Sequence, residues 1–161
     1  MAIQPPVPER TKRPRLSCVV VVYNMRREAE RTLFSLSSAY QRDVPADDYE
    51  VIVVENGSRD PIDEAYVRRF GENFKLLTVP DASQSPAPAL NFGAEQARGD
   101  IIVSMIDGAR MVSPGCIAWT LRAFDLFPDA AAIVPSWHLG PDVQNESVLA
   151  GYNQAVEDEL L

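Results

Sequence analysis

The sequence contains little of what several common active sites require. Two cysteines and one histidine in 161 residues are too few for a disulfide framework or a zinc site. From sequence alone, this single histidine gives little support to a Ser-His-Asp arrangement. Buried free thiols are the better interpretation of Cys18 and Cys116. No G-x-G-x-x-G follows the first apolar run and no G-x-x-x-x-G-K-[ST] occurs, which disfavours a dinucleotide fingerprint and a P-loop. Any ligand that carries phosphate must therefore be bound by something other than these two glycine-rich loops.

Basic residues and long apolar runs are also scarce. Fifteen Lys and Arg residues stand against 23 Asp and Glu, for a net charge of −8. This balance argues against a general nucleic-acid surface, because phosphate contacts need clustered cations. The first apolar run, residues 16–23, is much shorter than the roughly 20 residues of a membrane span, and nothing resembles a signal peptide. We expect a cytoplasmic protein.

The basic residues that do cluster lie in a proline-rich leader. Residues 1–14 carry four prolines and are predicted to form a flexible tail, since such a composition does not build a packed core. Its basic run, which continues to Arg15, is either simply solvated or a basic arm for an anionic membrane surface. The second interpretation implies peripheral contact with the inner face of the membrane. The run consists of Arg10, Lys12, Arg13 and Arg15.

Short apolar runs alternate with stretches of helical periodicity along the rest of the chain. Strands are predicted at 16–23, 49–54, 74–79, 100–106 and 130–135. Helices are predicted at about 26–40 after an Asn24 cap, from an Asp60 cap and Pro61 to about 70, at 88–98, and from Ser113-Pro114 to Phe127. This alternation predicts an α/β domain with a mainly parallel sheet and helices on both faces.

Ligands of open α/β sheets bind outside the carboxyl ends of the strands. That rule selects four places in this chain: Tyr23-Asn24, residues 55–58, the loop before Asn91, and residues 107–109.

Motifs at these places resemble those of the family-2 glycosyltransferases, in the family's order and at plausible spacing. They cover roughly residues 16–127. The motifs are Val19-Val-Val-Val-Tyr23-Asn24, Val53-Val-Glu55-Asn56-Gly57-Ser58, Ala89-Leu-Asn91-Phe-Gly93, Ala97-Arg-Gly99-Asp100, and Ile106-Asp107-Gly-Ala109 followed by Ser113-Pro114-Gly115.

The resemblance implies a Rossmann-like nucleotide-diphospho-sugar transferase fold of the glycosyltransferase A type, incomplete at the C-terminus. Residues 15–136 would form the nucleotide-sugar-binding domain, and residues 137–161 the start of an acceptor-side region that ends within an element. The implied activity is that of an inverting glycosyltransferase, which moves a sugar from a nucleoside diphosphate to an unknown hydroxyl. A role with cell-envelope polysaccharide follows from the same resemblance, and we expect the chain alone to be inactive.

The resemblance also implies a donor site that holds the base beside Tyr23 and the 55–58 turn. An aromatic ring gives a base a stacking face, and an acceptor on the turn can bond the N3–H of uracil. Asn56 stands where the family commonly has Asp; because an amide also donates, a UDP-linked donor is expected but the base is left open. The implied donor-binding residues are Tyr23, Asn24, Glu55, Asn56, Gly57, Ser58, Asn91, Asp107 and Arg110.

The expected metal site departs from the family pattern. The family's D-x-D binds a divalent cation, Mg or Mn, that bridges the diphosphate. Here Asp107 matches the first acid, but Ala109 replaces the usual ligand and Leu90 replaces a frequent Arg. Arg110 is a hypothetical substitute for the cation as a fixed positive charge.

Several other interpretations stay open. Tyr23 also suits a strand end, Asn56-Gly57 a turn, and Asp107 a cap. The family's catalytic base lies beyond this region, so the catalytic residues are unknown; Glu157-Asp158 and Trp137-His138 are weaker candidates for chemistry and for sugar contact. The alternative functions are a non-catalytic nucleotide or sugar-nucleotide binding module and a nucleotidyltransferase, although the Gly-rich, Lys-bearing first loop of the latter is absent.

Overall fold

The computed structural model describes residues 13–106, 110–134, 149–151, 153, 155–156 and 159. The chain divides into two compact units, residues 1–130 and 131–161. In the second unit, residues 131–134 form neither helix nor strand, and residues 149, 155, 156 and 159 are helical. The site and its supports, described below, belong to the first unit.

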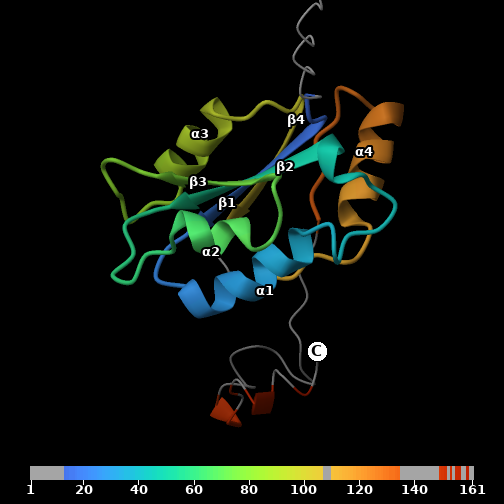
Figure 1. The fold of residues 1–161 in the computed structure, drawn as a ribbon. Helices are drawn as coiled ribbons and strands as arrows, with labels where there is room; N and C mark the ends of the chain where they lie inside the picture. The colour runs from blue at the N-terminus through green and yellow to red at the C-terminus, as the bar shows by residue number, and fades with distance from the viewer. Residues whose placement is uncertain are drawn as a thin grey trace, which may run out of the picture. The chain divides into compact units, whose positions relative to one another are not determined.

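Four parallel strands form the sheet of the first unit (Figure 1). The strands are β1 (Leu16–Val22), β2 (Tyr49–Glu55), β3 (Phe74–Thr78) and β4 (Ile101–Ile106), in the order β3-β2-β1-β4. The register pairs Val22 with Glu55 and Val21 with Ile106. The chain therefore leaves β1, β2 and β4 at one common edge, which we call the carboxyl edge.

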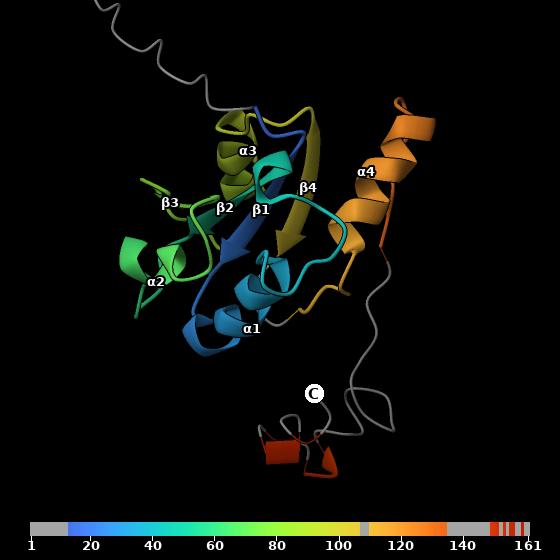
Figure 2. The same cartoon turned by 45° about the vertical axis from the view of Figure 1, so that its right-hand side comes forward.

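Helices cover both faces of this sheet (Figures 1 and 2), as predicted. They are α1 (Arg26–Leu36), α2 (Glu64–Arg68), α3 (Ala87–Glu95) and α4 (Cys116–Leu126), with a 3₁₀ turn, η1, at Ala46–Asp48. Buried residues of α1, α2 and α4 pack in one cluster with Leu16, Cys18, Val20 and Val22. Ala89 of α3 packs on the opposite face with Val19, Val21, Ile52 and Val54.

The sequence explains why the central strands form so reliably. β1 and β2 are buried on both faces over all their residues, which continuous runs of Val and Ile tolerate and alternating polar patterns do not. Gly93 lets α3 approach closely, because a Cβ there would lie 2.4 Å from Val19 Cγ1. The predicted bounds of these four strands agree with the structure to within about one residue.

The predicted start of the first helix, residue 26, is confirmed, but its predicted cap and its predicted end are wrong. The cap residue of α1 is Met25, not Asn24, whose side-chain oxygen instead accepts from the backbone N–H of Arg59. At the other end, Ser37 turns to extended backbone and its hydroxyl donates to the carbonyl of Phe34. α1 thus ends at Leu36, four residues before the predicted end.

The other helices also begin or end away from their predicted positions. α2 starts at Glu64, where Asp63 rather than Asp60 caps it by accepting from Tyr66 N–H at 2.7 Å. α3 ends at Glu95, before the predicted residue 98. α4 starts after Gly115, whose φ of 95° breaks the helical path from Ser113-Pro114. Local caps and glycine conformation decide these ends.

Two further predictions are corrected at the ends of the domain. The predicted strand at 130–135 is absent from residues 130–134, where Ile133 is 94% exposed; Pro135 lies outside the described residues. Residues 13 and 14 do not belong to a flexible tail, because Arg13 pairs with Asp100 at 2.8 Å and Pro14 is buried. No helix in the described ranges is long and apolar enough to cross a membrane.

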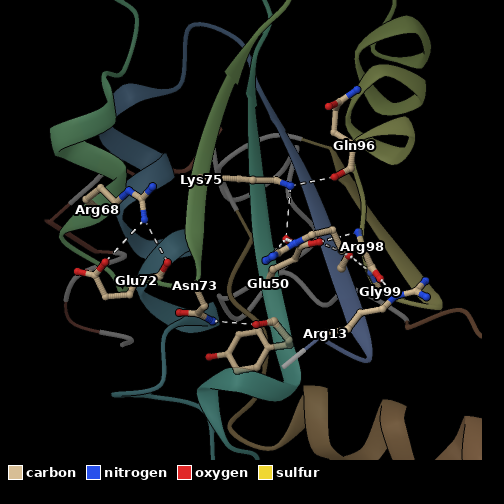
Figure 3. A network of polar contacts seen from close by, with 11 residues as sticks. Arg13, Glu50, Arg68, Glu72, Asn73, Lys75, Gln96, Arg98 and Gly99 are labelled. Carbon is tan, nitrogen blue, oxygen red and sulfur yellow. Dashed lines mark hydrogen bonds and ion pairs between the residues drawn. The ribbon is translucent and has the colours of Figure 1, made fainter. Parts of the chain in front are cut away.

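The opposite end of the sheet holds a polar network around a buried carboxylate (Figure 3). Glu50, 2% exposed, accepts from the hydroxyl of Ser17 at 2.7 Å and from the backbone N–H of Arg98 at 2.7 Å. Its second oxygen accepts from the Arg98 guanidinium at 3.0 and 2.9 Å and lies 3.4 Å from Lys75 Nζ. This network fixes the turn between α3 and β4.

Candidate functional site

The first two loops of the carboxyl edge are joined by hydrogen bonds between predicted site residues. The backbone N–H of Asn24 donates to Ser58 Oγ at 2.8 Å, and Asn24 Oδ1 accepts from the backbone N–H of Arg59 at 2.8 Å. Asn24 has a φ of 54°, which Asn adopts more readily than bulky residues. The loop after β1 and the turn after β2 therefore form one unit.

Glu55 closes the turn after β2. One of its carboxylate oxygens accepts from the backbone N–H of Ser58 at 2.8 Å, and the other from that of Ile62 at 3.3 Å. The residue is 2% exposed. Its charge is thus balanced by oriented backbone donors, and its position makes it a support of the turn.

Asn56 carries an acceptor for which the described part of the chain offers no partner. Its backbone N–H donates to Val22 O at 3.0 Å, and its side-chain amide donates to Ser83 O at 2.9 Å. The residue is 3% exposed, and its Oδ1 is buried without a hydrogen bond. The amide cannot simply be reversed, because the oxygen would then face the carbonyl of Ser83.

Gly57 lets the turn pack against the loop that follows β3. Its φ is 81°, and a Cβ at this position would lie 2.5 Å from the Cβ of Ala82. A residue with a side chain would be strained and would also displace that loop. Gly57 thus brings Asn56 within reach of Ser83.

The remaining predicted residues have different placements. Tyr23 follows β1 directly and its side chain is half exposed. Asn91 is exposed on α3, and Arg110 is exposed with its backbone N–H donating to Thr32 Oγ1 of α1 at 3.1 Å. Asp107 and Ala109 lie outside the described residues, as do Trp137-His138 and Glu157-Asp158. The structure therefore brings residues 23, 24 and 55–58 together at one edge.

A metal centre finds little support in the residues present. Within the described ranges, no group of three or more His, Cys, Asp or Glu residues could hold a metal ion. The D-x-A sequence at 107–109 offers one carboxylate, whereas Mg²⁺ and Mn²⁺ prefer several oxygen ligands. The described residues thus supply no set of ligands for a divalent cation, and Asp107, the expected ligand, lies outside them.

Two surface hollows lie at the amino ends of the strands, away from the carboxyl edge. One is lined by Arg15, Asp100, Ile101, Phe124, Asp125 and Pro128, and the other by Glu50, Arg68, Glu72, Asn73, Phe74, Lys75 and Arg98. Charged groups in the second hollow pair with one another (Figure 3). The carboxyl edge is the stronger candidate, because there a buried acceptor has no partner among the described residues.

Sequence reasoning missed the residues that orient the site. Ser83 and Ala82 belong to a loop whose composition predicts only irregular structure, and no sequence pattern indicates their contacts with Asn56 and Gly57. By contrast, Glu50, in the network at the opposite end of the sheet, is detectable in the sequence as a carboxylate that precedes the apolar run 51–54 within β2. Such a residue needs partners when it is buried.

Comparison with solved structures identifies the type of fold. The crystal structure of S. aureus TarS 1–349 aligns with a TM-score of 0.63 and 22% identity, over 76% of this chain and 38% of that chain. The same protein in complex with UDP-GlcNAc gives 0.61 and 20%, over 76% and 37%. The fold is that of the glycosyltransferase A type.

Sequence comparison then identifies the family. Glycosyltransferase AglE of Haloferax volcanii is 36% identical over 98 residues, which are 59% of this chain and 30% of that protein. Residues 17–149 match the family described as Glycosyl transferase family 2, and the chain belongs to that family. The resemblance seen in the five motifs is thereby confirmed. The chain spans about a third of the length of these relatives.

Proposed function

We propose that the carboxyl edge binds the nucleotide of a nucleoside diphosphate sugar, as the donor-binding part of an inverting glycosyltransferase that moves the sugar to a hydroxyl acceptor. The unpaired, buried Oδ1 of Asn56 is the observation that carries this proposal. A buried acceptor without a partner costs about 1–3 kcal/mol. A ligand that donates a hydrogen bond there recovers this free energy.

Asn56 also favours particular bases. N3–H of uracil and N1–H of guanine can both donate to its Oδ1, whereas N3 of cytosine carries no hydrogen. The half-exposed ring of Tyr23 supplies a stacking face beside the turn. We favour UDP, because the family motifs suggest it and S. aureus TarS, which has the same type of fold, was solved with UDP-GlcNAc.

The diphosphate and the catalytic steps are proposed from sequence positions. The departing diphosphate gains negative charge, which either a divalent cation at Asp107 or the guanidinium of Arg110 would stabilise. Inverting transfer also needs a base beside the acceptor hydroxyl, whose proton it takes. In the family that base lies beyond the nucleotide-binding half, so the catalytic residue is unknown, and Glu157-Asp158 is a weaker candidate within this chain.

A nucleotide-binding experiment tests the proposal. The chain is titrated with UDP, GDP and CDP in a thermal-shift assay, with Mn²⁺ or with EDTA; a ligand at about 100 times its Kd adds about 2.7 kcal/mol of stability. We expect UDP to raise the Tm more than CDP does. The Asn56→Ala change should lower the affinity for UDP about tenfold. Asn56→Asp keeps the acceptor for the base but loses the donor to the carbonyl of Ser83, so it should bind UDP more tightly than Asn56→Ala and more weakly than the wild type.

The matched control is Asn73→Ala, which changes the same residue type at the opposite end of the sheet. It should leave nucleotide affinity unchanged. If no nucleotide raises the Tm, or if Asn56→Ala binds UDP as the wild type does, the proposed site is wrong. If nucleotide binding survives EDTA but is lost in Arg110→Ala, Arg110 is the group that holds the diphosphate. If nucleotide binding is lost in EDTA, a divalent cation holds it.

A non-catalytic sugar-nucleotide binding module is the second candidate function. Ala109 favours it, because a methyl group supplies no ligand to a catalytic cation. The module would show the same nucleotide binding and the same response to Asn56→Ala. It would transfer no sugar in any form of the protein that contains the acceptor side.

We also propose that the protein works in the cytoplasm at the inner face of a membrane, where cell-envelope polysaccharide is built. The basic run that ends at Arg15 supports contact with anionic lipid.

A further inference from the structure

Three polar side chains of α1 and of the turn that follows it are buried where apolar residues would normally pack. Thr32 and Ser35 are fully buried, and Gln41 is 6% exposed. Thr32 and Ser35 share the core-facing side of α1 with two leucines. A buried polar group costs free energy unless it is hydrogen-bonded, so each of these side chains needs partners. We call the three the anchor residues, because all of them bond to the segment 110–117.

The first part of this segment is held by hydrogen bonds from its backbone to α1. The N–H of Arg110 donates to Thr32 Oγ1 at 3.1 Å. The N–H of Val112 donates to Ser35 Oγ, also at 3.1 Å. This part of the chain forms neither helix nor strand, so side chains supply the partners that its backbone donors require. The path from β4 to α4 therefore follows α1 (Figure 2).

Gln41 holds the other end of the segment. Its amide nitrogen donates to the carbonyl of Ser113 at 3.1 Å and to that of Ser35 at 2.7 Å. Its Oε1 accepts from the backbone N–H of Ile117 at 3.2 Å. Because Ile117 is the second residue of α4, this one side chain joins the end of α1 to the start of α4. Both ends of the segment are thus attached to the same helix and its turn.

The segment follows the strand that lies farther from Asn56 along the carboxyl edge. β1 stands between β2 and β4, and neighbouring strands are about 4.8 Å apart, so the ends of β2 and β4 are separated by about 10 Å. An extended nucleoside diphosphate that bonds Asn56 through its base spans this distance with its ribose and phosphates. Asp107 and Arg110, the two groups proposed for the diphosphate, both follow β4 in the sequence.

We propose that Thr32, Ser35 and Gln41 are positioning residues of the donor site, which hold the segment 110–117 where it meets the diphosphate. The inference rests on the nucleotide-binding function proposed above. A segment that is fixed before the ligand arrives loses little freedom on binding, so more of the interaction free energy appears as affinity. The role is the same whether a guanidinium or a divalent cation holds the phosphates, because the segment carries the first and follows the proposed ligand of the second.

A comparison of two ligands separates positioning from a purely structural role. Uridine and UDP carry the same base, but only UDP carries the diphosphate that would reach the segment. Loosening the segment should lower the affinity for UDP and leave the affinity for uridine unchanged. A general loss of stability would change both affinities or neither. NMR titration of the full chain measures both ligands, because it detects weak as well as tight binding.

Ser35→Ala and Ser37→Ala form a matched pair of variants. Both serines are buried, and each donates its hydroxyl to the carbonyl three residues before it at 2.7 Å. Only Ser35 also accepts from the segment, through the N–H of Val112. We expect Ser35→Ala to lower the UDP affinity about three- to tenfold and to leave the uridine affinity within about twofold. Ser37→Ala should bind both ligands as the wild type does.

Thr32 provides an independent test through a conservative replacement. Thr32→Val keeps the shape of the side chain but removes the acceptor for the N–H of Arg110, whereas Thr32→Ser keeps the hydroxyl. The UDP affinity should fall in Thr32→Val and return close to the wild-type value in Thr32→Ser.

The outcomes distinguish this inference from the proposed function. If Ser35→Ala and Thr32→Val weaken UDP and uridine equally, or leave the UDP affinity unchanged, the positioning role is wrong while the nucleotide site stands. If the wild type binds neither ligand, the proposed UDP site is wrong, and the positioning role is wrong with it.

Discussion

Replacing Glu50 by glutamine should destabilise the domain far more than removal of a surface charge. The carboxylate is 2% exposed and joins Ser17, Lys75 and Arg98. Glutamine keeps one oxygen for Ser17 Oγ and Arg98 N–H, but it presents an NH₂ donor to the guanidinium and the ammonium group. Two of the partners then lose their charged acceptor.

The expected loss is about 2–3 kcal/mol of unfolding free energy. Breaking a buried ion pair by removal of one partner costs roughly 3–5 kcal/mol. Here the cost is lower, because the Arg98 side chain is 57% exposed and that of Lys75 is 29% exposed, so both can turn to water. With a urea m-value of about 1–3 kcal/mol/M, the midpoint should fall by about 1–2 M.

The dependence on pH identifies the carboxylate as the cause. Burial alone would raise the pKa of Glu50, but hydrogen bonds from Ser17 and Arg98 and the charge of Lys75 outweigh it and hold the pKa below its ordinary value of 4.5. A carboxylate whose pKa is lower in the folded than in the unfolded state stabilises the protein at pH values above its unfolded pKa. This stabilisation is lost as the pH falls through the folded pKa. The unfolding free energy of the wild type should therefore exceed that of Glu50→Gln by the full amount at pH 7. In acid the two free energies should converge.

Urea unfolding followed by circular dichroism measures both effects. The control is Glu64→Gln, which removes the exposed pair with Arg68 at 2.8 Å and should cost no more than about 0.5 kcal/mol. If Glu50→Gln costs no more than this control, or if its deficit is the same at acid and neutral pH, the stabilising role assigned to the carboxylate is wrong.

Two further predictions concern the turn after β2 and the buried thiol. The Gly57→Ala change places a residue with a side chain at a φ of 81° and brings its Cβ to 2.5 Å from that of Ala82. It should lower the unfolding free energy by about 1–3 kcal/mol in the same assay and lower the affinity for UDP in the thermal-shift titration. A variant with unchanged stability would refute the packing described. Burial raises the pKa of Cys18 to about 12, so this thiol should stay unlabelled by a disulfide reagent at pH 8 until urea unfolds the protein; prompt labelling of the folded chain would contradict its burial.

The sequence predicts the strands well and the helix ends poorly, for physical reasons. A run such as residues 16–22 is apolar throughout, and only a doubly covered strand buries it. A helix end depends on which of several similar residues caps it. Asp60 and Asp63 both suit that role, but Asp60 forms an ion pair with Arg26 at 3.7 Å, and Asp63 caps the helix. That choice depends on a contact with another element.

The same limit applies to the candidate site. The rule that ligands bind at the carboxyl ends of strands identifies the neighbourhood from sequence alone. It does not distinguish Glu55 from Asn56, because their difference arises from partners: Glu55 is occupied by two backbone N–H groups, whereas Asn56 retains an unpaired oxygen fixed by Ser83. Ser83 is 27 residues away along the chain.

The two buried carboxylates of β2 have parallel structural roles at its two ends. Glu50 and Glu55 are five positions apart, so they point to opposite faces of the sheet. Glu50 anchors the turn that follows α3 on one face, and Glu55 anchors the segment that leads to α2 on the other. Because the carboxylates bond to backbone N–H groups, they fix where each connection leaves the sheet. Glu55 is thus a positioning residue for the proposed nucleotide site, because it holds the turn that presents Asn56.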